Sequence, residues 1–389
     1  MTSDASVLLA WARSAVVPRG GALAHLAAHE IAAPVVRALL VRGGIDASAV
    51  DAVICGNALG AGGNPARMTA LAAGLPDGTA AFSIDTQCCS GLDAVAMGAG
   101  LIAAGQAQVV VAGGVEAWSR SPIRQHRPRT QNEAPVSYER PAFAPDPSRD
   151  PDLTLAAARY AAQAGITRAA QDAYAVSSHA KALAWREHMP SEIVPVGAAV
   201  QDTYARSITV DRAARIPIEA LSDQWVSSDD RRVTAVSRLA IAPQADGAAF
   251  VLMASPRASA ALGARALLRW RAALAVGTAP EMPMLAAARA AKDLLHRQGI
   301  EATALWGTEL HEAFAVQAIA FAEELGIEPE RLNRGGGGLA RGHPIGASGA
   351  VSLVRLLADM AREAPSGAMG LASIAAAGGL GSAALVERL

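Results

Sequence analysis

Short, continuous runs of apolar residues recur along the chain and are separated by longer segments of helical character. Four such runs occupy residues 51–55, 108–112, 303–310 and 370–375. Runs of this length are typical of strands that are buried on both faces of a sheet. Apolar segments of helical length occupy residues 92–104 and 350–361. The alternation of strands and helices predicts an α/β fold.

The same order of features occurs twice, once in each half of the chain. In the first half, a strand around Val53 precedes the sequence CCSG, an apolar helix and a strand that ends at Gly114. In the second half, a strand that ends near His311 precedes GHPIGASG, an apolar helix and a strand that ends at Gly379. The repeated unit is far longer than the roughly 20 to 50 residues of a solenoid repeat. The chain is therefore predicted to contain two related halves packed together.

A more polar segment with clustered prolines separates the two halves and is predicted to be an insertion. The expected organisation is an N-terminal half of residues 1–117 and 230–258, an inserted loop domain of residues 118–229 and a C-terminal half of residues 259–389. Within the insertion a helix is expected to begin after Thr167 as its N-cap and to run through Ala173 to Trp185. Such insertions often cover a site that rigid halves build.

The composition favours a folded protein that binds neither nucleic acid nor membranes. Of the 389 residues, 52% are hydrophobic and 18% are charged, which suffices for one large core or two fused cores. A formal net charge of −1 provides no field that would attract a phosphate backbone or an anionic membrane. No apolar stretch reaches the roughly 18 to 20 residues of a membrane span, and Asp4 lies where a secretory signal carries positive charge. Because Cys55, Cys88 and Cys89 cannot build a disulfide framework, we expect a cytoplasmic location.

Cys88 is the first candidate for chemistry. It lies in DTQCCSGLDAVAMG, after a short extended segment over residues 81–85 and at the start of a predicted helix. Backbone N–H groups at a helix N-terminus stabilise a thiolate, which would lower the pKa of the thiol and make it a nucleophile. The alternative is that Cys88 and Cys89 are small core residues at a tight turn.

Two histidines could complete a site around this cysteine. His343 lies in RGGGGLARGHPIGASGA, whose many glycines indicate a close backbone approach, and its imidazole could act as a base. The alternative, a phosphate-binding loop, lacks the Lys-Ser/Thr ending that such loops carry. His311 follows a predicted strand at the end where α/β sites are built, and could donate to a carbonyl oxygen that gains negative charge. A structural role is the alternative for His311, although its place relative to His343 mirrors that of Cys55 relative to Cys88.

The motifs GNPAR, CCSGLDA, AGGVEAWS, HEAFA and GHPIGASGA occur in this order over nearly the whole chain. This series resembles the thiolase superfamily of acetyl-CoA acetyltransferases and 3-ketoacyl-CoA thiolases, and in particular its members with a HEAF motif. The resemblance implies a duplicated fold of two mixed sheets with layered helices, in the order α-β-α-β-α, plus the inserted loop domain. It also implies that Cys88 is acylated, that His343 activates it and that His311 helps to form an oxyanion hole.

The same resemblance has implications for ligands and assembly. It implies a coenzyme A thioester as substrate, no covalently bound cofactor and no metal. It further implies a homodimer or a dimer of dimers, in which the GNPAR segment, residues 63–67, reaches across the interface.

The segment GLASIAAAGGLG departs from the pattern of the family. Thiolases carry a cysteine there that moves the α-proton of the second thioester, and Ala375 occupies that position. Ala377 replaces a glycine, so the backbone of Ala377 and Gly378 is expected to support an oxyanion beside an added methyl group. Ala242 replaces a serine that the family places near the pantetheine arm. Basic residues between positions 120 and 129 could contact phosphates instead, or form a solvated loop face.

The leading hypothesis is an acyltransferase that forms an acyl thioester on Cys88 and passes the acyl group to a second substrate. Without the second cysteine, thiolysis and Claisen condensation are expected to be slow, because general acid–base help is worth about 10²- to 10⁴-fold. Cys55 and Cys89 are not expected to replace the missing thiol, since successive residues point apart. The alternatives are a decarboxylating condensing enzyme, which resembles ketosynthases with a Cys-His-His set, and a non-catalytic partner subunit.

Overall fold

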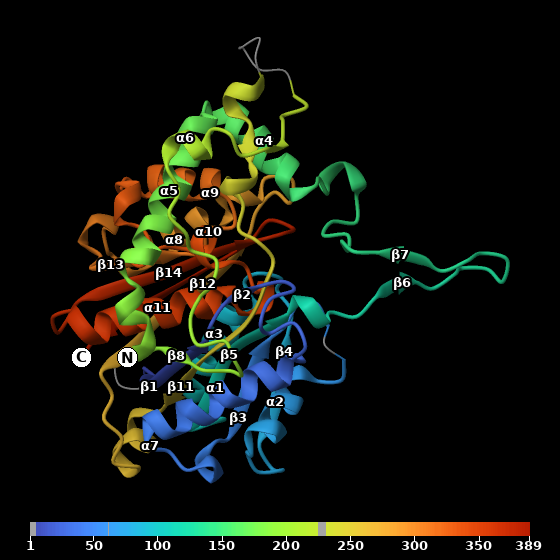
Figure 1. The fold of residues 1–389 in the computed structure, drawn as a ribbon. Helices are drawn as coiled ribbons and strands as arrows, with labels where there is room; N and C mark the ends of the chain where they lie inside the picture. Colours follow the sequence, from blue (N-terminus) through green and yellow to red (C-terminus); the bar gives the residue numbers. More distant parts are fainter. Residues whose placement is uncertain (1–4, 61, 225–230) are drawn as a thin grey trace.

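The computed structural model describes residues 5–60, 62–224 and 231–389, which form one large mixed sheet covered by helices (Figure 1). The 11-stranded sheet follows the order β13-β14-β15-β12-β1-β11-β5-β3-β4, with β2 paired to β11 and β8 paired to β1. Its strands are β1 (Val7–Ser14), β2 (Val17–Pro18), β3 (Ala52–Gly56), β4 (Ala80–Ile84), β5 (Val109–Ala117), β8 (Ile193–Val194), β11 (Ala245–Ala254), β12 (Leu268–Gly277), β13 (Gly307–Leu310), β14 (Met369–Ala376) and β15 (Leu380–Arg388). The expected boundary at residues 229 and 230 lies outside the described residues.

The two predicted sheets are present as two halves that share an edge. The halves meet where β1 pairs antiparallel with β12 through only Val7–Arg269 and Leu8–Leu268. Each half mixes directions: β3 runs parallel to β4 and β5, and β13 runs parallel to β14, whereas β11 and β15 run antiparallel to their neighbours. The mixed, duplicated α/β fold that was predicted is therefore confirmed.

One predicted strand is shorter than expected. Residues 303–306 do not belong to the strand predicted over 303–310, because a 3₁₀ turn at Ala302–Ala304 precedes it. Local hydrogen bonds from Ala304 N to Glu301 O and from Leu305 N to Ala302 O hold that turn, so the apolar run begins before the sheet does.

The helices form the outer and middle layers of a five-layer arrangement. Helices α1 (Ala28–Gly43) and α2 (Pro65–Ala73) cover the first half of the sheet. Helices α3 (Ser90–Ala103) and α11 (Ser348–Glu363) pack against each other between the halves. Helix α8 (Ala286–Gln298) covers the second half, with α9 (Ala315–Leu325) beside it, and the short helices α7 (Pro256–Ala261) and α10 (Gly338–Arg341) lie in connections. The helical layers and the two halves of the sheet therefore stack in the order α-β-α-β-α.

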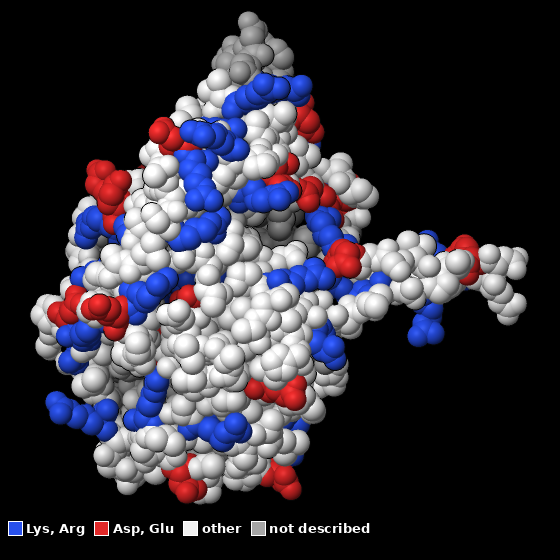
Figure 2. Space-filling model, viewed as in Figure 1, with Lys and Arg blue, Asp and Glu red and all other residues white. Residues whose placement is uncertain are grey.

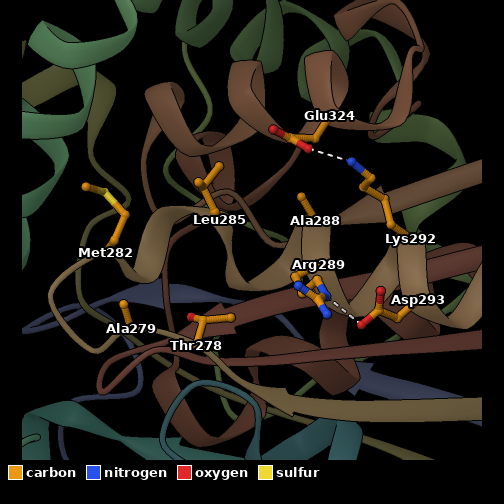
Figure 3. Close-up of a pocket in the computed structure, with 9 residues that line it drawn as sticks. All are labelled: Thr278, Ala279, Met282, Leu285, Ala288, Arg289, Lys292, Asp293 and Glu324. Carbon is orange, nitrogen blue, oxygen red and sulfur yellow. Dashed lines mark hydrogen bonds and ion pairs between the residues drawn. The ribbon is translucent and has the colours of Figure 1, made fainter.

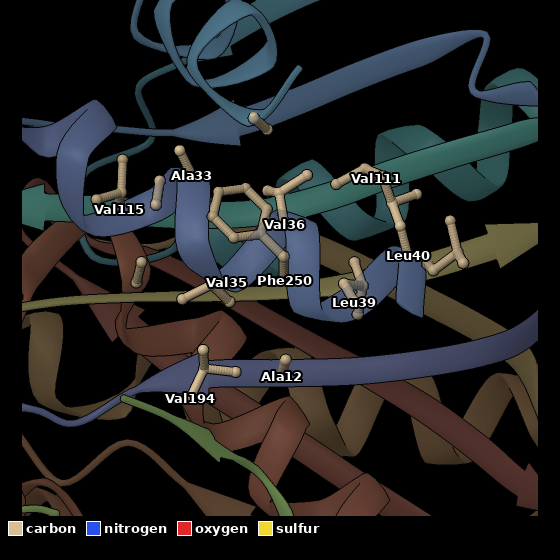
Figure 4. Packing of buried hydrophobic residues seen from close by; sticks show 14 of the residues in the cluster. Ala12, Ala33, Val35, Val36, Leu39, Leu40, Val111, Val115, Val194 and Phe250 are labelled. Carbon is tan, nitrogen blue, oxygen red and sulfur yellow. The ribbon is translucent and has the colours of Figure 1, made fainter. Parts of the chain in front are cut away.

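The packing of α1 on the sheet shows why this helix forms (Figure 4). Apolar residues three and four positions apart turn one stripe of α1 toward the sheet. Val36 and Leu39 of that stripe are fully buried and lie in one cluster with Phe250 of β11 and Val111 of β5. Burial of one such side chain contributes about 1.5–3 kcal/mol relative to exposure, so the stripe holds α1 in place.

The insertion lies over one end of the sheet and sends a hairpin outward. It contains α4 (Leu153–Ala164), α5 (Arg168–Ala184), α6 (Val210–Ala213), strand β9 (Ile218–Ala220) and the hairpin of β6 (Arg124–His126) and β7 (Val136–Tyr138), and β9 pairs with β10 (Val236–Ser237), which follows the insertion. The hairpin projects away from the body of the molecule (Figure 1). Helix α5 begins directly after Thr167, which is the predicted N-cap and accepts a hydrogen bond from the N–H of Ala170 at 3.1 Å.

A buried network of ion pairs ties the insertion to both halves. Arg13 of β1 donates from Nε to Glu192 at 2.7 Å, and its two terminal nitrogens donate to Asp202 at 2.7 and 2.9 Å. Arg355 of α11 pairs with the same Glu192 and with Asp359. Removal of one partner from a buried pair costs about 3–5 kcal/mol, so this network makes the three parts depend on one another.

On the face seen in Figure 2, charged residues of both signs are mixed, with Lys and Arg interspersed with Asp and Glu. Within the part of the chain that the structure describes, no helix combines the length and the apolar character needed to cross a bilayer.

Candidate active site

Cys88 lies in a tight turn between β4 and α3. Gln87 has a φ of 56°, a conformation that non-glycine residues rarely adopt, and its N–H donates to Asp85 Oδ1 at 2.8 Å. Ser90 Oγ accepts from the N–H of Thr86 at 2.9 Å and donates to the carbonyl of Gln87 at 2.6 Å. These contacts hold the strained turn and place the thiol just before the first residue of α3.

The structure places His343 against this thiol. Its Nε2 lies 3.2 Å from Cys88 Sγ, and its Nδ1 lies 2.7 Å from Ser348 Oγ. Ser348 donates its one hydroxyl proton to the carbonyl of Pro344 at 3.0 Å, so its oxygen accepts the proton of His343 Nδ1. Nε2 therefore presents its lone pair to the sulfur, and the thiol is the donor. Ser348 thus determines the tautomer that a base needs.

Burial keeps both partners uncharged. It raises the pKa of Cys88 to about 12, although the backbone N–H groups of Ala377 and of Cys88 itself favour the thiolate. It lowers the pKa of His343 to about 4. The prediction that the helix N-terminus lowers the pKa of Cys88 was therefore wrong, because the loss of hydration outweighs the N–H groups. The resting pair is a thiol and a neutral imidazole.

The loop of His343 reaches Cys88 through a cradle of glycines in the first half. A Cβ atom on Gly114 of β5 would lie 2.1 Å from the carbonyl oxygen of Gly346, and one on Gly56 of β3 would lie 2.7 Å from it. A Cβ on Gly91 of α3 would lie 2.9 Å from the same atom. Real Cβ atoms do not approach this closely, so glycine is required at all three positions.

Glu116 fastens the same loop from the end of β5. Its carboxylate accepts from the N–H of Gly346 at 3.0 Å, from the N–H of Ala58 at 2.9 Å and from Asn57 Nδ2 at 2.7 Å. Burial raises the pKa of Glu116 to about 7. The glutamate of the AGGVEAWS motif therefore joins one loop from each half of the chain.

His311 lies beside His343, at the carboxyl end of β13. The two ring centroids are 4.4 Å apart. The backbone N–H of His311 donates to the carbonyl of Ser373 at 3.0 Å. Burial and the neighbouring His343 hold its pKa well below the usual range, so the ring is neutral. Among the described residues, no hydrogen-bond partner faces its buried Nε2. A neutral imidazole in this state can donate to an oxygen that gains negative charge.

A small, mainly apolar cavity of about 100 Å³ opens at Cys88 and His343. Its other described lining residues are Leu153, Ile241, Ala242, Pro283, Met284, Ala313, Phe314, Gln317, Ala375, Ala376 and Ala377. Ala375, where the family has its second cysteine, thus faces the same space as the nucleophile. Gln317 also lines the cavity, although no motif had singled it out. In the sequence, only its position three residues after Phe314, the N-cap of α9, could have pointed to Gln317.

The remaining predicted positions lie outside this cavity. Gly378 has a φ of 76°, and a Cβ atom there would lie 3.1 Å from the carbonyl oxygen of Phe143 in the insertion. Cys89 donates to the carbonyl of Ile374 at 3.7 Å and Cys55 to that of Gly56 at 3.6 Å. Neither thiol lines the cavity in place of the cysteine that is missing at position 375.

The described linings of three larger cavities contain neither Cys nor His. One of about 450 Å³ lies against α8 and α9, and its charged residues pair with one another (Figure 3). Arg289 lies 2.6 Å from Asp293, and Lys292 lies 2.7 Å from Glu324. No group of His, Cys, Asp and Glu within the described ranges is arranged to hold a metal ion.

The chain matches two family models in succession. Residues 6–257 match the model for the thiolase N-terminal domain, and residues 264–388 match the model for the thiolase C-terminal domain. It is 36% identical over 393 residues to an acetyl-CoA acetyltransferase of Pseudomonas aeruginosa, which covers 98% of this chain and 99% of the relative. It is 35% identical over 397 residues to an acetyl-CoA acetyltransferase of Shinella zoogloeoides, with 100% of both chains covered.

Solved structures are similar over the same length. The Acat5 thiolase from Ascaris suum, in complex with coenzyme A, superimposes with a TM-score of 0.89 at 28% identity, covering 99% of this chain and 100% of that one. The Bacillus anthracis acetyl-CoA acetyltransferase superimposes with a TM-score of 0.90 at 31% identity, covering 100% and 99%.

Because Cys88 and His343 are both uncharged at rest, the alkylation rate of Cys88 should depend on pH. Because only the thiolate is alkylated, the rate of modification by iodoacetamide should rise roughly tenfold per pH unit between about pH 6 and about pH 9. This follows from the pKa of about 12 that burial gives the thiol. Intact-mass spectrometry at each pH measures the rate, and Cys88→Ala gives the background from the other two cysteines. A rate that is constant over this range would show a thiolate–imidazolium pair instead.

Proposed function

The chain belongs to the thiolase family, and from that premise we propose that it takes an acyl group from an acyl-CoA onto Cys88 and transfers it to a second substrate. The observation that carries the proposal is the 3.2 Å contact between Cys88 Sγ and the unprotonated Nε2 of His343, oriented by Ser348. Relatives named acetyl-CoA acetyltransferase and a structural neighbour in complex with coenzyme A support an acyl-CoA as the donor.

The first step forms the acyl-enzyme. His343 Nε2 accepts the proton of the Cys88 thiol as the sulfur attacks the thioester carbon, which makes a tetrahedral oxyanion. The backbone N–H groups of Cys88 and Ala377 favour the thiolate form of Cys88, and with His311 they are the proposed donors to this oxyanion. Collapse breaks the bond to the sulfur of coenzyme A, which leaves with the proton that His343 returns.

The second step transfers the acyl group to a nucleophile. His343 accepts the dissociable proton of the acceptor as the acceptor attacks the thioester carbon, and it returns this proton to the Cys88 sulfur as the acyl–Cys88 bond breaks. No described residue of the cavity other than His343 offers a base of the kind that would remove an α-proton. Gln317 does not ionise, and Ala375 ends in a methyl group. We therefore propose acyl transfer to an acceptor that needs no α-deprotonation.

A decarboxylating condensation is the second candidate function. Its carbanion arises from loss of CO₂, so it needs no base at Ala375. The pair of neutral imidazoles with ring centroids 4.4 Å apart is the observation that favours it. A non-catalytic partner subunit is less well supported, because the nucleophile and its oriented base lie together.

Assembly as a homodimer is proposed through the free edge of the sheet. Strand β4 ends the sheet and exposes unpaired backbone groups, with Phe82 48% exposed and Met97 of α3 beside it 53% exposed. Both residues line a groove of about 600 Å³, as does Asn64 of the GNPAR segment. A second copy related by a two-fold axis would cover this apolar edge with its own. The β6–β7 hairpin offers a further surface for a dimer of dimers.

The state of the cysteines supports a reducing compartment. Cys55, Cys88 and Cys89 are all free and buried. We propose the cytoplasm as the location, because free thiols persist there.

Incubation of the wild type with acetyl-CoA should add an acetyl group to Cys88, detectable by intact-mass spectrometry and peptide mapping. Cys88→Ala should form no adduct. His343→Asn should slow adduct formation by about 10²- to 10⁴-fold, because the thiol loses its base. His25→Asn, which changes an exposed histidine, serves as the control. An adduct that persists in Cys88→Ala contradicts the proposal.

Condensation of two acetyl-CoA molecules should be slow in the wild type and about 10²- to 10⁴-fold faster in Ala375→Cys, which restores an acid/base in the cavity. The assay follows acetoacetyl-CoA formation, with adduct formation as the reference for folding. Release of CO₂ from malonyl-CoA by the wild type would favour the decarboxylating function instead. A wild type that condenses acetyl-CoA as fast as Ala375→Cys would show that another group handles the α-proton.

Phe82→Lys should convert the dimer to a monomer, because it places a charge on the apolar edge that the partner would cover. Light scattering after size exclusion measures the mass. Val41→Lys, at an 81% exposed position on α1, is the control and should keep the wild-type mass. An unchanged mass in Phe82→Lys would exclude β4 as the interface.

A further inference from the structure

Glu312 follows His311 directly and is a buried carboxylate with four hydrogen-bond donors. It has 1% of its surface exposed. Each of its two oxygens accepts two hydrogen bonds: Oε1 from Tyr174 Oη at 2.9 Å and Asn333 Nδ2 at 2.5 Å, and Oε2 from Ser178 Oγ at 2.7 Å and the N–H of Leu339 at 3.2 Å. A shift of this carboxylate would leave several buried donors unpaired, which is costly. Glu312 is therefore held in place from several sides.

Asn333 holds the chain on both sides of His311. Its Oδ1 accepts from the N–H of Leu310 at 2.8 Å, and its Nδ2 donates to Glu312. The N–H of Leu310 can only donate, so the oxygen of the amide faces it and the NH₂ group faces the carboxylate. Asn333 is fully buried and has a φ of 52°, which few non-glycine residues adopt. One side chain thus bridges the residues that precede and follow His311.

The glycine run of residues 335–338 packs against the same part of the chain. A Cβ atom on Gly337 would lie 2.1 Å from Cδ of Glu312, and one on Gly338 would lie 2.8 Å from Cε1 of His311. Only glycine leaves room for contacts this close. The backbone that leads to His343 therefore touches both the carboxylate of Glu312 and the ring of His311.

Two of the four donors to Glu312 come from helix α5 of the insertion. Tyr174 and Ser178 lie four residues apart on this helix and so share one face of it. Ser178 Oγ accepts from the N–H of Gly337 at 3.0 Å, so its single hydroxyl proton is the one donated to Glu312. The insertion thus contacts the residue next to His311 and the glycine run at once.

We propose that Glu312 is a positioning residue for His311, through which the insertion sets the place of the imidazole at the acyl carbonyl. This inference rests on the proposed acyl transfer at Cys88. Among the described residues, His311 Nε2 has no hydrogen-bond partner that would hold the ring from its other side. A donor stabilises an oxyanion only within a narrow range of distances, so a displaced ring loses most of its effect.

The test is a double-mutant cycle between Glu312 and His311, read out as the rate of acetyl adduct formation on Cys88 from acetyl-CoA. Glu312→Gln keeps the shape of the side chain but places an NH₂ group against buried donors, and should slow acetylation by about 10- to 100-fold. His311→Ala should slow it by about 10²- to 10³-fold. The double variant should be no slower than His311→Ala, because the effect of Glu312 passes through the imidazole.

Tyr174→Phe is a milder variant that removes one donor and keeps the aromatic ring. It should slow acetylation by about 3- to 10-fold, the range expected for one hydrogen bond, and should have no effect in the His311→Ala background. This result would assign part of the control of His311 to the insertion.

Alkylation of Cys88 by iodoacetamide separates positioning from a general loss of structure, because this reaction forms no oxyanion at a carbonyl. Its rate in Glu312→Gln should stay close to that of the wild type. Asp172→Asn is the matched control, since Asp172 is a buried carboxylate on the same helix but bonds to Arg168 and Ser237. It should keep the wild-type ratio of acetylation to alkylation.

Two outcomes overturn the inference and leave acyl transfer intact. One is a Glu312→Gln variant that keeps the wild-type ratio of acetylation to alkylation. The other is an equal slowing of acetylation by Glu312→Gln in the presence and in the absence of His311. Absence of an acetyl adduct in the wild type overturns the proposed function and this inference with it.

Discussion

The site depends on a contact between backbones with no side chains between them. The carbonyl of Gly346 lies against Gly56, Gly91 and Gly114, and a single methyl group on any of them would occupy the space of that carbonyl. Because interiors are close-packed, the loop cannot retreat without losing the hydrogen bond from Gly346 to Glu116. The distance between His343 and Cys88 is therefore set by how the two halves of the chain pack.

The same packing determines the charge state of the site. Packing of the loop against Cys88 buries both side chains, and the loss of hydration raises the pKa of the thiol and lowers that of His343. A neutral pair avoids the cost of a buried charge in the resting state. In the proposed reaction, the negative charge that develops during attack is met by fixed N–H groups in a buried site, where electrostatic interactions are stronger than in water.

Family membership bears on the first half of the reaction more than on the second. In the proposed function, the residues around Cys88 and His343 load the acyl group, and the motifs of the family surround them. At Ala375 the chain has a methyl group where an acid or base would face the cavity. Fold and family thus do not determine the acceptor, which depends on what this cavity recognises.

The sequence by itself determined the α/β class, the internal duplication and the chemical types at positions 88, 311, 343 and 375. These follow from local patterns, because strands buried on both faces must be apolar and a nucleophile or its absence is visible in the residue itself. The start of β13 was predicted at residue 303 and lies at Gly307, since a local turn replaces the sheet before it. The tertiary structure alone decided the joining of the two sheets, the pKa of Cys88, the tautomer set by Ser348 and the hydrogen bonds that meet at Glu312. Each of these depends on neighbours that are distant in the sequence, and desolvation and hydrogen bonding are properties of that assembled environment.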